Sequence, residues 1–588
     1  MEKINRQQFL QQSLILSAVV ALKPAGYAFF NKKGKTDPLF KRMVIANDAR
    51  VFIYLQSPVP KTYSNRTAFD FALLSASFAA ETSKYFQHPE IVTILNKLSV
   101  VLTNAQSDDG TISMGNLESP PDTAFLLAPV CAAFHILSDH QTNELEPVLK
   151  SMKTFILKAG EALKTGGVHT PNHRWVVSAA LAQINQLFPD KSYVSRIDDW
   201  LGEGIYQDQD GHYPERSINY AVVENRSFLT TGRLLNRPAL FEPVRKNLQM
   251  VYYYMDPDGS LVTTDSRRQD QYETRSIITW YSLYRYLAIK DQNKKFAAIT
   301  RFIEGLDNFE ENILSQSLYQ FLDNPLLQEE LPEPEALPIV FEKLFSSSKL
   351  ARIRNGNKSI TLFGGVDWPF IIASGRSDSP DFFAYRNGNA VLKYLRLSTD
   401  FFSTGYFYSS TLEKQNEAYI LQHKREVPYY QPLPLDQRKP DGDYALTPSI
   451  DGRFWNKMAF DKRQVSNIKT LETKVLVTVT AAEVVLDIEV AGMKGVEVTL
   501  ELCFREGGQL SGVVKKENSG EDFYLEQGEG LYEYKGEQIR FGPGIVAGKK
   551  PEFLDGEMYR SHFGTLRTNG SHVYLTGITP FKHKLNFY

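Results

Sequence analysis

The hydrophobic pattern changes its period near the middle of the chain, which predicts a helical half followed by a β-rich half. From about residue 67 to residue 322, apolar side chains recur every three or four positions, as on the buried face of a helix. Beyond residue 353, apolar and polar side chains alternate, as in strands that bury one side. At 588 residues the chain is too long for one hydrophobic core, so we expect at least two domains.

Amphipathic segments in the helical half are separated by loops rich in Gly, Pro, Asp and Asn. Many helices with short connections predict stacked helical hairpins, arranged as a bundle, a solenoid or a closed (α/α) toroid. No clear sequence repeat decides between these arrangements, and we take the toroid as the expected one. The expected helices include residues 91–102, 152–163, 175–187, 218–234, 240–254, 274–288 and 308–321.

The β-rich half shows its alternation most clearly in two segments, residues 484–490 and 496–504. Each is expected to be a strand with one face in the core and one face in water. Short strands with Asn-Gly, Asp-Gly and Gly-Gly turns continue to Tyr588, which predicts an antiparallel β-sandwich.

A boundary lies between the two halves at residues 329–338, which read EELPEPEALP. An acidic stretch with several prolines is typical of a stiff linker. Residues 340–345 are expected to form a short helix-like stretch after it. We therefore divide the chain into a toroid at 35–328, a linker at 329–352 and a β-sandwich at 353–588.

Residues 1–28 have the order of a secretory signal peptide. Lys3 and Arg6 precede an apolar stretch at 14–22, and small residues follow near Ala28. Residues 5–10, NRQQFL, are also similar to a twin-arginine signal in which one arginine is missing. We expect an exported, periplasmic protein, with a buried N-terminal helix as the alternative. No later segment predicts a membrane span.

Composition and charge narrow the range of partners and cofactors. The net charge of -2 produces no overall field that would attract nucleic acid, and the 12% of aromatic residues suits the flat faces of sugar rings, although β-domains also use many aromatics. The two cysteines, Cys131 and Cys503, exclude a disulfide scaffold and are expected to be lone buried thiols. No metal, phosphate-loop or serine-esterase motif is present, so no cofactor or metal is expected. Nothing in the sequence indicates an oligomeric state.

Two polar loops of the helical half carry the residue types that acid–base chemistry needs. Residues 166–175, GGVHTPNHRW, place Asn172 and His173 before a helix that is expected to start near Trp175. Asn172 can instead be no more than the N-cap of that helix. Residues 208–220, DQDGHYPERSINY, gather a His, two Tyr, a Glu and an Arg, for which the alternative is a solvated loop.

Two further loops are weaker candidates. Adjacent Arg267 and Arg268 can grip a carboxylate through forked N–H donors, or they can form a surface salt-bridge cluster with neighbouring aspartates. In residues 116–123, NLESPPDT, Glu118 and Asp122 can contact a substrate, although an Asp at such a position is more often a helix cap.

These motifs, set in a helical toroid followed by a β-sandwich, resemble the heparinase II/III-like and alginate-lyase group of polysaccharide lyases. That group carries an Asn-His pair on one helical hairpin and a Tyr on a later one, after an Asp-Gly-x-x-x-Glu stretch. Asn172 and His173 match the pair, residues 210–217 match the stretch, and Tyr220 falls where the tyrosine is expected.

The resemblance implies β-elimination on a uronic-acid-containing glycan, without a cofactor. Asn172 and an arginine, Arg216 or Arg267, would neutralise the uronate carboxylate as charge builds on it. His173 or a deprotonated Tyr would take the C5 proton, and Tyr220 would protonate the leaving oxygen. The implied catalytic residues are Asn172, His173, Tyr220, Arg216 and, as a reserve acid, Tyr213, and the implied substrate-binding residues are Arg267, Arg268, Glu215, His212, Asp122, Glu118 and Trp175.

Two other functions fit the same architecture. A glycoside hydrolase, such as a glucuronidase, needs two carboxyl groups about 5 Å apart if it retains configuration and farther apart if it inverts it. A non-catalytic glycan-binding protein needs neither a base nor an acid. The carboxyl candidates for a hydrolase are Glu215, Asp210, Asp122 and Glu118.

Overall fold

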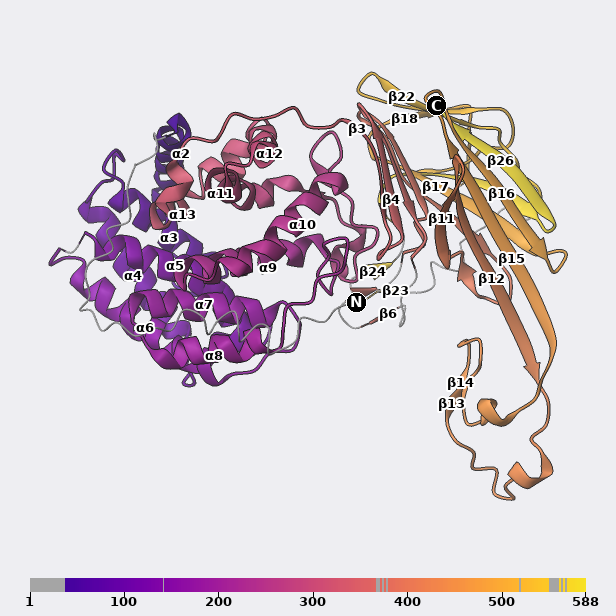
Figure 1. The fold of residues 1–588 in the computed structure, drawn as a ribbon, viewed down its shortest axis with the longest axis horizontal. Coiled ribbons are helices and arrows are strands. Elements are labelled where there is room, and N and C mark those ends of the chain that lie inside the picture. The colour runs from indigo at the N-terminus through magenta and orange to yellow at the C-terminus, as the bar shows by residue number, and fades with distance from the viewer. Residues whose placement is uncertain are drawn as a thin grey trace.

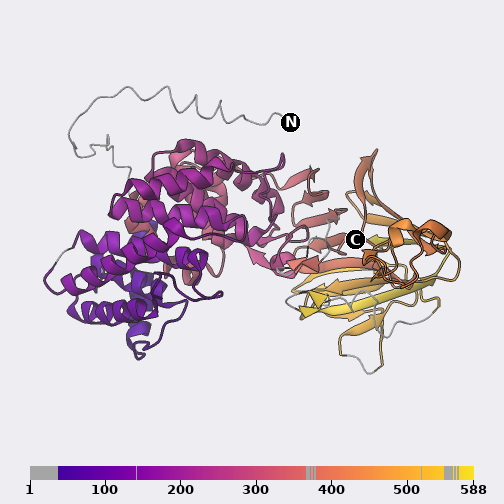
Figure 2. The same ribbon diagram turned by 90° about the horizontal axis from the view of Figure 1, so that it is seen from below.

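The chain forms a helical domain followed by a β-domain, as the change of period predicts (Figure 1). The computed structural model describes residues 37–588 except 141, 366–370, 373–374, 377–378, 518–519, 549–559, 562–563 and 566–567. The expected signal peptide therefore lies outside the described residues. In both views the strands that follow the helical domain lie on the side of the β-domain nearest to it (Figures 1 and 2).

Two rings of helices make up the helical domain. The inner ring contains α3 (Thr67–Ala79), α5 (Pro120–Ser138), α7 (His173–Leu187), α9 (Ile218–Leu234), α11 (Tyr281–Asp291) and α13 (Leu318–Asp323). The outer ring contains α2 (Pro38–Leu55), α4 (Pro89–Ala105), α6 (Glu146–Thr165), α8 (Lys191–Gly202), α10 (Phe241–Tyr254) and α12 (Lys294–Glu304). Inner helices pack on one another in chain order from α3 to α11, and α13 packs back on α3 and α5. The expected (α/α) toroid is confirmed.

The inner helices are apolar on most sides because they face both the outer ring and one another. Helix α5 is by length and composition apolar enough to cross a membrane, but it packs between α3 and α7 and most of it is buried. Outer helices such as α6 keep a polar face toward water. The predicted helix at 274–288 begins later, at Tyr281, because Arg275 and Ser276 pair with another strand first.

Two large sheets form the β-domain. In order across the first lie β19 (Val514–Lys515), β20 (Asp522–Tyr524), β25 (Ser571–Ile578), β17 (Glu497–Phe504), β9 (Ala390–Thr399), β8 (Phe383–Asn387), β5 (Lys358–Phe363), β4 (Leu350–Asn355) and β3 (Val340–Phe345), with β10 (Gly405–Tyr406) beside β9. The second contains β11 (Thr411–Gln415), β12 (Ala418–Tyr430), β15 (Val465–Val479), β16 (Val484–Gly492), β26 (Phe581–Phe587), β22 (Glu537–Gly542), β21 (Gly530–Tyr534) and β18 (Gln509–Ser511). Their pairings are antiparallel except for β20 with β25, and one apolar cluster fills the space between them. The expected sandwich is confirmed.

Four small two-stranded sheets complete the described strands. Their members are β1 (Ser260–Leu261) with β2 (Arg275–Ser276), β6 (Ile371–Ile372) with β7 (Gly375–Arg376), β13 (Thr447–Pro448) with β14 (Trp455–Asn456), and β23 (Arg560–Ser561) with β24 (Gly564–Thr565). Strand β7 packs against the 3₁₀ turn η2 (Gln269–Tyr272) of the helical domain. The β-domain therefore reaches a loop that carries one of the sequence motifs.

Two strand expectations are wrong. Residues 340–345 are the edge strand β3 rather than a helix-like stretch, because they pair along their whole length with β4. The first sheet thus begins inside residues 329–352, which we expected to be linker. Strand β17 is buried on both faces, not one: Glu501 is buried, and its Oε1 lies 2.8 Å from Nδ1 of His572 on the neighbouring strand β25.

Buried ion pairs join the two domains. Arg352 on β4 contacts Asp256, just beyond α10, with Nη2 2.5 Å from Oδ1, and its Nε donates to the carbonyl oxygen of Tyr253 at 3.1 Å. Arg386 on β8 contacts Asp258 at 2.8 Å and lies 3.5 Å from Asp256. Burial raises the pKa of Asp256, but the two arginines outweigh it and hold that pKa below its usual value. The turn at residues 256–259, which reads Asp-Pro-Asp-Gly, therefore binds the first sheet to the helical domain.

Replacing Arg352 with Met should lower the free energy of unfolding by about 3 kcal/mol, since it leaves the buried Asp256 with the more distant Arg386 as its cation and the Ser359 hydroxyl as a hydrogen-bond donor. Urea denaturation monitored by circular dichroism measures this change. Lys584→Met, on an exposed strand residue whose ion pair with Asp487 is 3.5 Å long, is the control and should change it by less than about 0.5 kcal/mol. Equal effects of the two substitutions would contradict the docking role of Arg352.

Candidate active site

The N-terminal ends of α7 and α9 and the loop after β1 bring three of the sequence motifs together. Ser217 caps α9, its Oγ accepting from the Tyr220 N–H at 3.1 Å. Asp270, fully buried, accepts from Ser217 Oγ at 3.0 Å and from the Asn219 N–H at 3.1 Å. The loop carrying the two arginines is thereby fixed to the start of α9.

At the centre of this site Glu215 links two of the predicted residues. Asn172 Nδ2 donates to Glu215 Oε2 at 2.7 Å, and Arg268 Nη1 pairs with the other carboxylate oxygen. Asn172 is fully buried and Glu215 is 6% exposed. Asn172 occupies the N-cap position of α7, yet its side chain makes no capping hydrogen bond. The interpretation of Asn172 as a mere cap is therefore wrong.

Tyr220 lies under the same arginine. The guanidinium carbon of Arg268 is 4.3 Å from the centroid of the Tyr220 ring. Gln269 Nε2 donates to the Tyr220 hydroxyl oxygen at 2.9 Å, so that oxygen has a fixed position. A negative charge on the oxygen would have both the amide donor and the nearby cation to stabilise it.

His173 lies beside this cluster as a neutral imidazole. Burial, mainly, and the neighbouring His169 and Arg268 lower its pKa to about 4, against the opposing effect of Asp122. Its Nδ1 is buried and has no hydrogen-bond partner among the described residues. The ring of His169 packs edge-on against it, with centroids 4.7 Å apart. His173 is therefore unprotonated at neutral pH.

Three predicted site residues lie in the core instead. The Tyr213 hydroxyl donates to Asn225 Oδ1 at 2.7 Å, and burial raises the pKa of Tyr213 well above its usual value. His212 is buried at the domain boundary, 2.9 Å from the Tyr254 hydroxyl. Trp175 is 3% exposed and belongs to the toroid core. None of these three is placed to touch a glycan.

The remaining arginines border the cluster. Arg216 is half-buried with a φ of 49°, a left-handed conformation that is uncommon for a residue with a side chain. Arg267 Nη1 donates to the Pro214 carbonyl oxygen at 2.8 Å, and its N–H donates to the Glu215 carbonyl oxygen at 3.1 Å. Arg267 therefore binds backbone and holds the two loops together, while Arg268 reaches the centre of the site.

The loop before α5 borders the site at a distance. Glu118 is exposed, and its N–H donates to Ser113 Oγ at 3.0 Å. Asp122 accepts two hydrogen bonds of 3.0 Å from Asn116, and Ser119 rather than Asp122 caps α5. The negative charge of Asp122 acts to raise the pKa of His173. Its carboxylate, however, is hydrogen-bonded to Asn116 in the same loop.

Two residues of this region were missed by the sequence reasoning. Gln269 has no titratable group and so attracted no attention beside the arginines. Glu224, one helical turn beyond Tyr220 on α9, is 1% exposed with neither carboxyl oxygen bonded in the described part of the protein. Burial, together with the charge of Glu215, raises the pKa of Glu224 well above its usual value, which favours its protonated form. In the sequence, the position of Glu224 within a helix indicated no functional role.

Metal binding has no visible basis here: no group of three or more His, Cys, Asp and Glu able to hold a metal ion occurs within the described ranges. Both cysteines are free and buried, as expected.

Comparisons with solved structures show a shared fold. Heparinase III matches with a TM-score of 0.55 and 11% identity, over 95% of this chain and 85% of the other. A Paenibacillus xanthan lyase matches with a TM-score of 0.53 and 10% identity, over 94% and 57%. The Streptomyces coelicolor A3 chondroitin AC lyase matches with a TM-score of 0.51 and 12% identity, over 96% and 80%. No protein-family model and no curated protein sequence matches the chain. The fold is that of polysaccharide lyases.

Proposed function

We propose that this protein is a polysaccharide lyase that cleaves a uronic-acid-containing glycan by β-elimination. The observation that carries the proposal is the assembly of Asn172, Glu215, Arg268 and Tyr220, with neutral His173 beside them, at the N-terminal ends of two inner helices. The fold shared with three polysaccharide lyases supports it.

In this proposal Arg268 stabilises the charge that develops during the reaction. Removal of the C5 proton of a uronate pushes negative charge onto its carboxylate, and a fixed cation nearby lowers the barrier. Arg268 replaces Arg216 and Arg267 in this role, because its guanidinium lies against Tyr220. Asn172 is buried on Glu215, so we assign it a positioning role: it holds the carboxylate that orients Arg268.

His173 and Tyr220 then divide the proton transfers. A neutral imidazole is the proton acceptor that the first step needs, and His173 is neutral above about pH 4. Tyr220 delivers a proton to the leaving oxygen, and the amide of Gln269 keeps its hydroxyl in place. The bond broken is between the glycosidic oxygen and C4, and a double bond forms between C4 and C5.

Hydrolysis is less well supported than elimination. Glu215, the central carboxylate, is already bonded to Asn172 and Arg268. Glu224 is fully enclosed, and Asp122 holds its own loop. None of these three carboxyl groups is both unbonded and exposed, whereas a glycosidase requires a pair that can reach the substrate.

The experiment that tests the proposal is incubation with a panel of glucuronate-, iduronate-, mannuronate- and guluronate-containing glycans. A lyase should produce the ultraviolet absorbance of an unsaturated uronate together with new reducing ends. Reducing ends without that absorbance would overturn elimination. Neither signal on any member of the panel would favour a binding protein.

At acidic pH, the dependence of kcat/KM on pH should reflect the protonation of His173. Because the pKa of His173 is about 4, its proton-accepting form persists as the pH falls below 6.5, the usual value for a histidine. We expect kcat/KM to change little between about pH 7 and about pH 5 and to fall as the pH approaches about 4. Initial rates in overlapping buffers measure this, with circular dichroism to show that the protein stays folded. Half-loss of activity near pH 6.5 in folded protein would contradict the assignment of His173 as base.

A further inference from the structure

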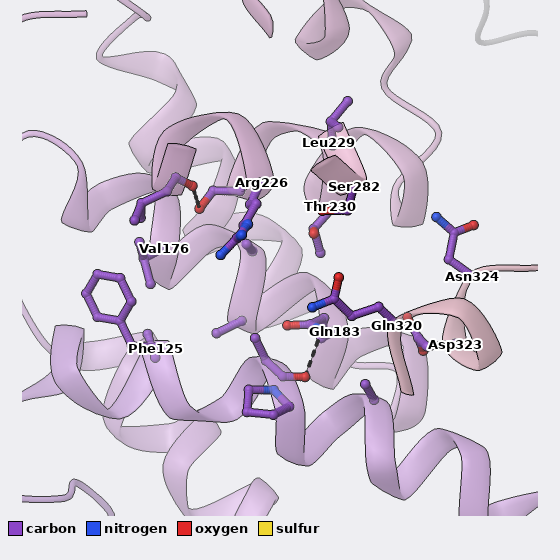
Figure 3. A pocket seen from close by; sticks show the side chains of 18 of the residues that line it. Phe125, Val176, Gln183, Arg226, Leu229, Thr230, Ser282, Gln320, Asp323 and Asn324 are labelled. Atoms are coloured by element: carbon purple, nitrogen blue, oxygen red, sulfur yellow. Dashed lines mark hydrogen bonds between the residues drawn. The ribbon is translucent and has the colours of Figure 1, made fainter. Parts of the chain in front are cut away.

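A cavity lined by residues of the inner helices lies on the axis of the toroid (Figure 3). Its volume is about 340 Å³, within the range of about 300–1,000 Å³ common for small-molecule sites. Val176 and Val223 line it, and they lie one turn beyond His173 and Tyr220 on the same faces of α7 and α9. Phe125 also lines the cavity and packs edge-on against His173, with centroids 6.1 Å apart.

Arg226 projects into this cavity from α9 (Figure 3). Its side chain is exposed even though it lies inside the toroid, so its accessible surface faces the hollow. Desolvation lowers the pKa of its guanidinium, as expected for a deep position. Its Nη2 donates to the Thr279 carbonyl oxygen at 2.8 Å, and it forms no ion pair within the described part of the chain. The guanidinium therefore keeps donors available for an anion.

The acid that lines the cavity does not neutralise Arg226. Asp323 is engaged by Arg233 at 3.0 Å and by His135 at 2.9 Å. The hydrogen bond to Asp323 raises the pKa of His135. The charged side chains that line the cavity are Arg226, Arg233 and Asp323. Two cations and one anion give the lining a net positive charge, even if His135 is neutral.

A second hollow continues from the cavity toward α3 and α13. Its volume is about 450 Å³, and it shares Arg226 and the exposed ring of Phe69 with the cavity. Arg50 and Arg66 also line it, and Arg66 pairs with Asp70 at 3.2 Å. Among the other lining residues are four amide side chains: Asn65, Asn312, Gln316 and Gln320. Amides, an aromatic face and arginines suit an acidic sugar.

We propose that the axial cavity is a subsite for an anionic sugar unit, whose carboxylate or sulfate is bound by Arg226. This proposal rests on the proposed function, because the sugar unit bound in the cavity belongs to the same glycan that the active site would cleave. Arg226 lies six residues beyond Tyr220 on α9, about 9 Å along the helix axis at 1.5 Å per residue. The subsite is thus separate from the residues assigned to proton transfer, and it selects glycans with an acidic group at a second position.

Binding of small probes tests the subsite without any turnover. D-glucuronate and N-acetylglucosamine 6-sulfate are titrated into the full chain by calorimetry, next to their neutral counterparts glucose and N-acetylglucosamine. The acidic probes should bind the wild type at least tenfold more tightly than the neutral ones. Arg226→Gln should weaken the acidic probes by about tenfold to a hundredfold, as expected for loss of a charged hydrogen bond, and leave the neutral ones unchanged.

Arg245→Gln is the matched control, because Arg245 lies on the outer helix α10 and pairs with Asp291 at 2.7 Å. It should bind every probe as the wild type does. If the acidic probes bind Arg226→Gln as tightly as the wild type, the subsite is overturned. It is also overturned if the neutral probes bind the wild type as tightly as the acidic ones do. This second result needs only the wild-type protein, so it holds whether or not the variant folds. If binding of the acidic probes depends on Arg226 but the protein cleaves no glycan by elimination, the subsite is supported and only the proposed lyase function is contradicted.

Discussion

Tyr220→Phe is expected to reduce kcat by about 10²- to 10⁴-fold, the usual contribution of a positioned acid. The substitution removes the hydroxyl that receives the Gln269 hydrogen bond and keeps the ring under Arg268. The fold should therefore stay intact. Initial rates of absorbance increase on a glycan that the wild type cleaves give the loss, and circular dichroism reports the fold.

Tyr213→Phe is the matched control, since it removes the same hydroxyl from a residue only seven positions earlier. That hydroxyl is buried against Asn225, so its loss should lower the free energy of unfolding by about 1–3 kcal/mol and leave kcat close to the wild-type value. A fully active Tyr220→Phe, or an inactive but folded Tyr213→Phe, would contradict the assignment of Tyr220.

Arg268→Gln should reduce kcat/KM by about 10²- to 10³-fold, as expected when a group that stabilises developing charge is lost. Steady-state rates over a range of glycan concentrations separate kcat from KM, and most of the loss should lie in kcat. The variant also leaves Glu215 buried with only Asn172 as partner, so it should be less stable. Adding Glu215→Gln should recover stability without recovering activity.

Arg267→Gln is the comparison for that substitution. Arg267 bonds to the Pro214 carbonyl oxygen rather than to Tyr220 or Glu215 side-chain atoms, so we expect a loss of less than about tenfold. Equal losses for the two arginines in folded proteins would show that charge near the site, rather than the position of Arg268, matters.

Much of the fold was predictable because each half has one dominant period. The segment 218–234 is helix α9 to the residue, since Ser217 is a good cap and the apolar spacing is regular. Closure of the ring was not predictable from periodicity. It depends on α13 packing on α3 and α5, and no sequence repeat indicates that contact. Strand β17 was misjudged since Glu501 looks like a solvent-facing residue in sequence, but a partner on another strand buries it.

The candidate site was harder to predict than the fold because its contacts join distant segments. Residue types indicated Asn172, Glu215, Arg268 and Tyr220, but not that Glu215 would bond to Asn172 rather than face a substrate. Within one run, Tyr213 turned inward and Tyr220 outward, and loops have no period from which that could be read. Arg226 gave no signal at all, since a single arginine on a helix is most often a surface residue.

Cleavage in heavy-oxygen water tests the central claim most directly. Elimination breaks the bond between C4 and the glycosidic oxygen and adds no water, whereas hydrolysis places an oxygen atom from water in one product. The account predicts that mass spectra of the products contain no heavy oxygen introduced by cleavage and that every new non-reducing end is unsaturated. Heavy oxygen incorporated at each cut, in saturated products, would contradict it.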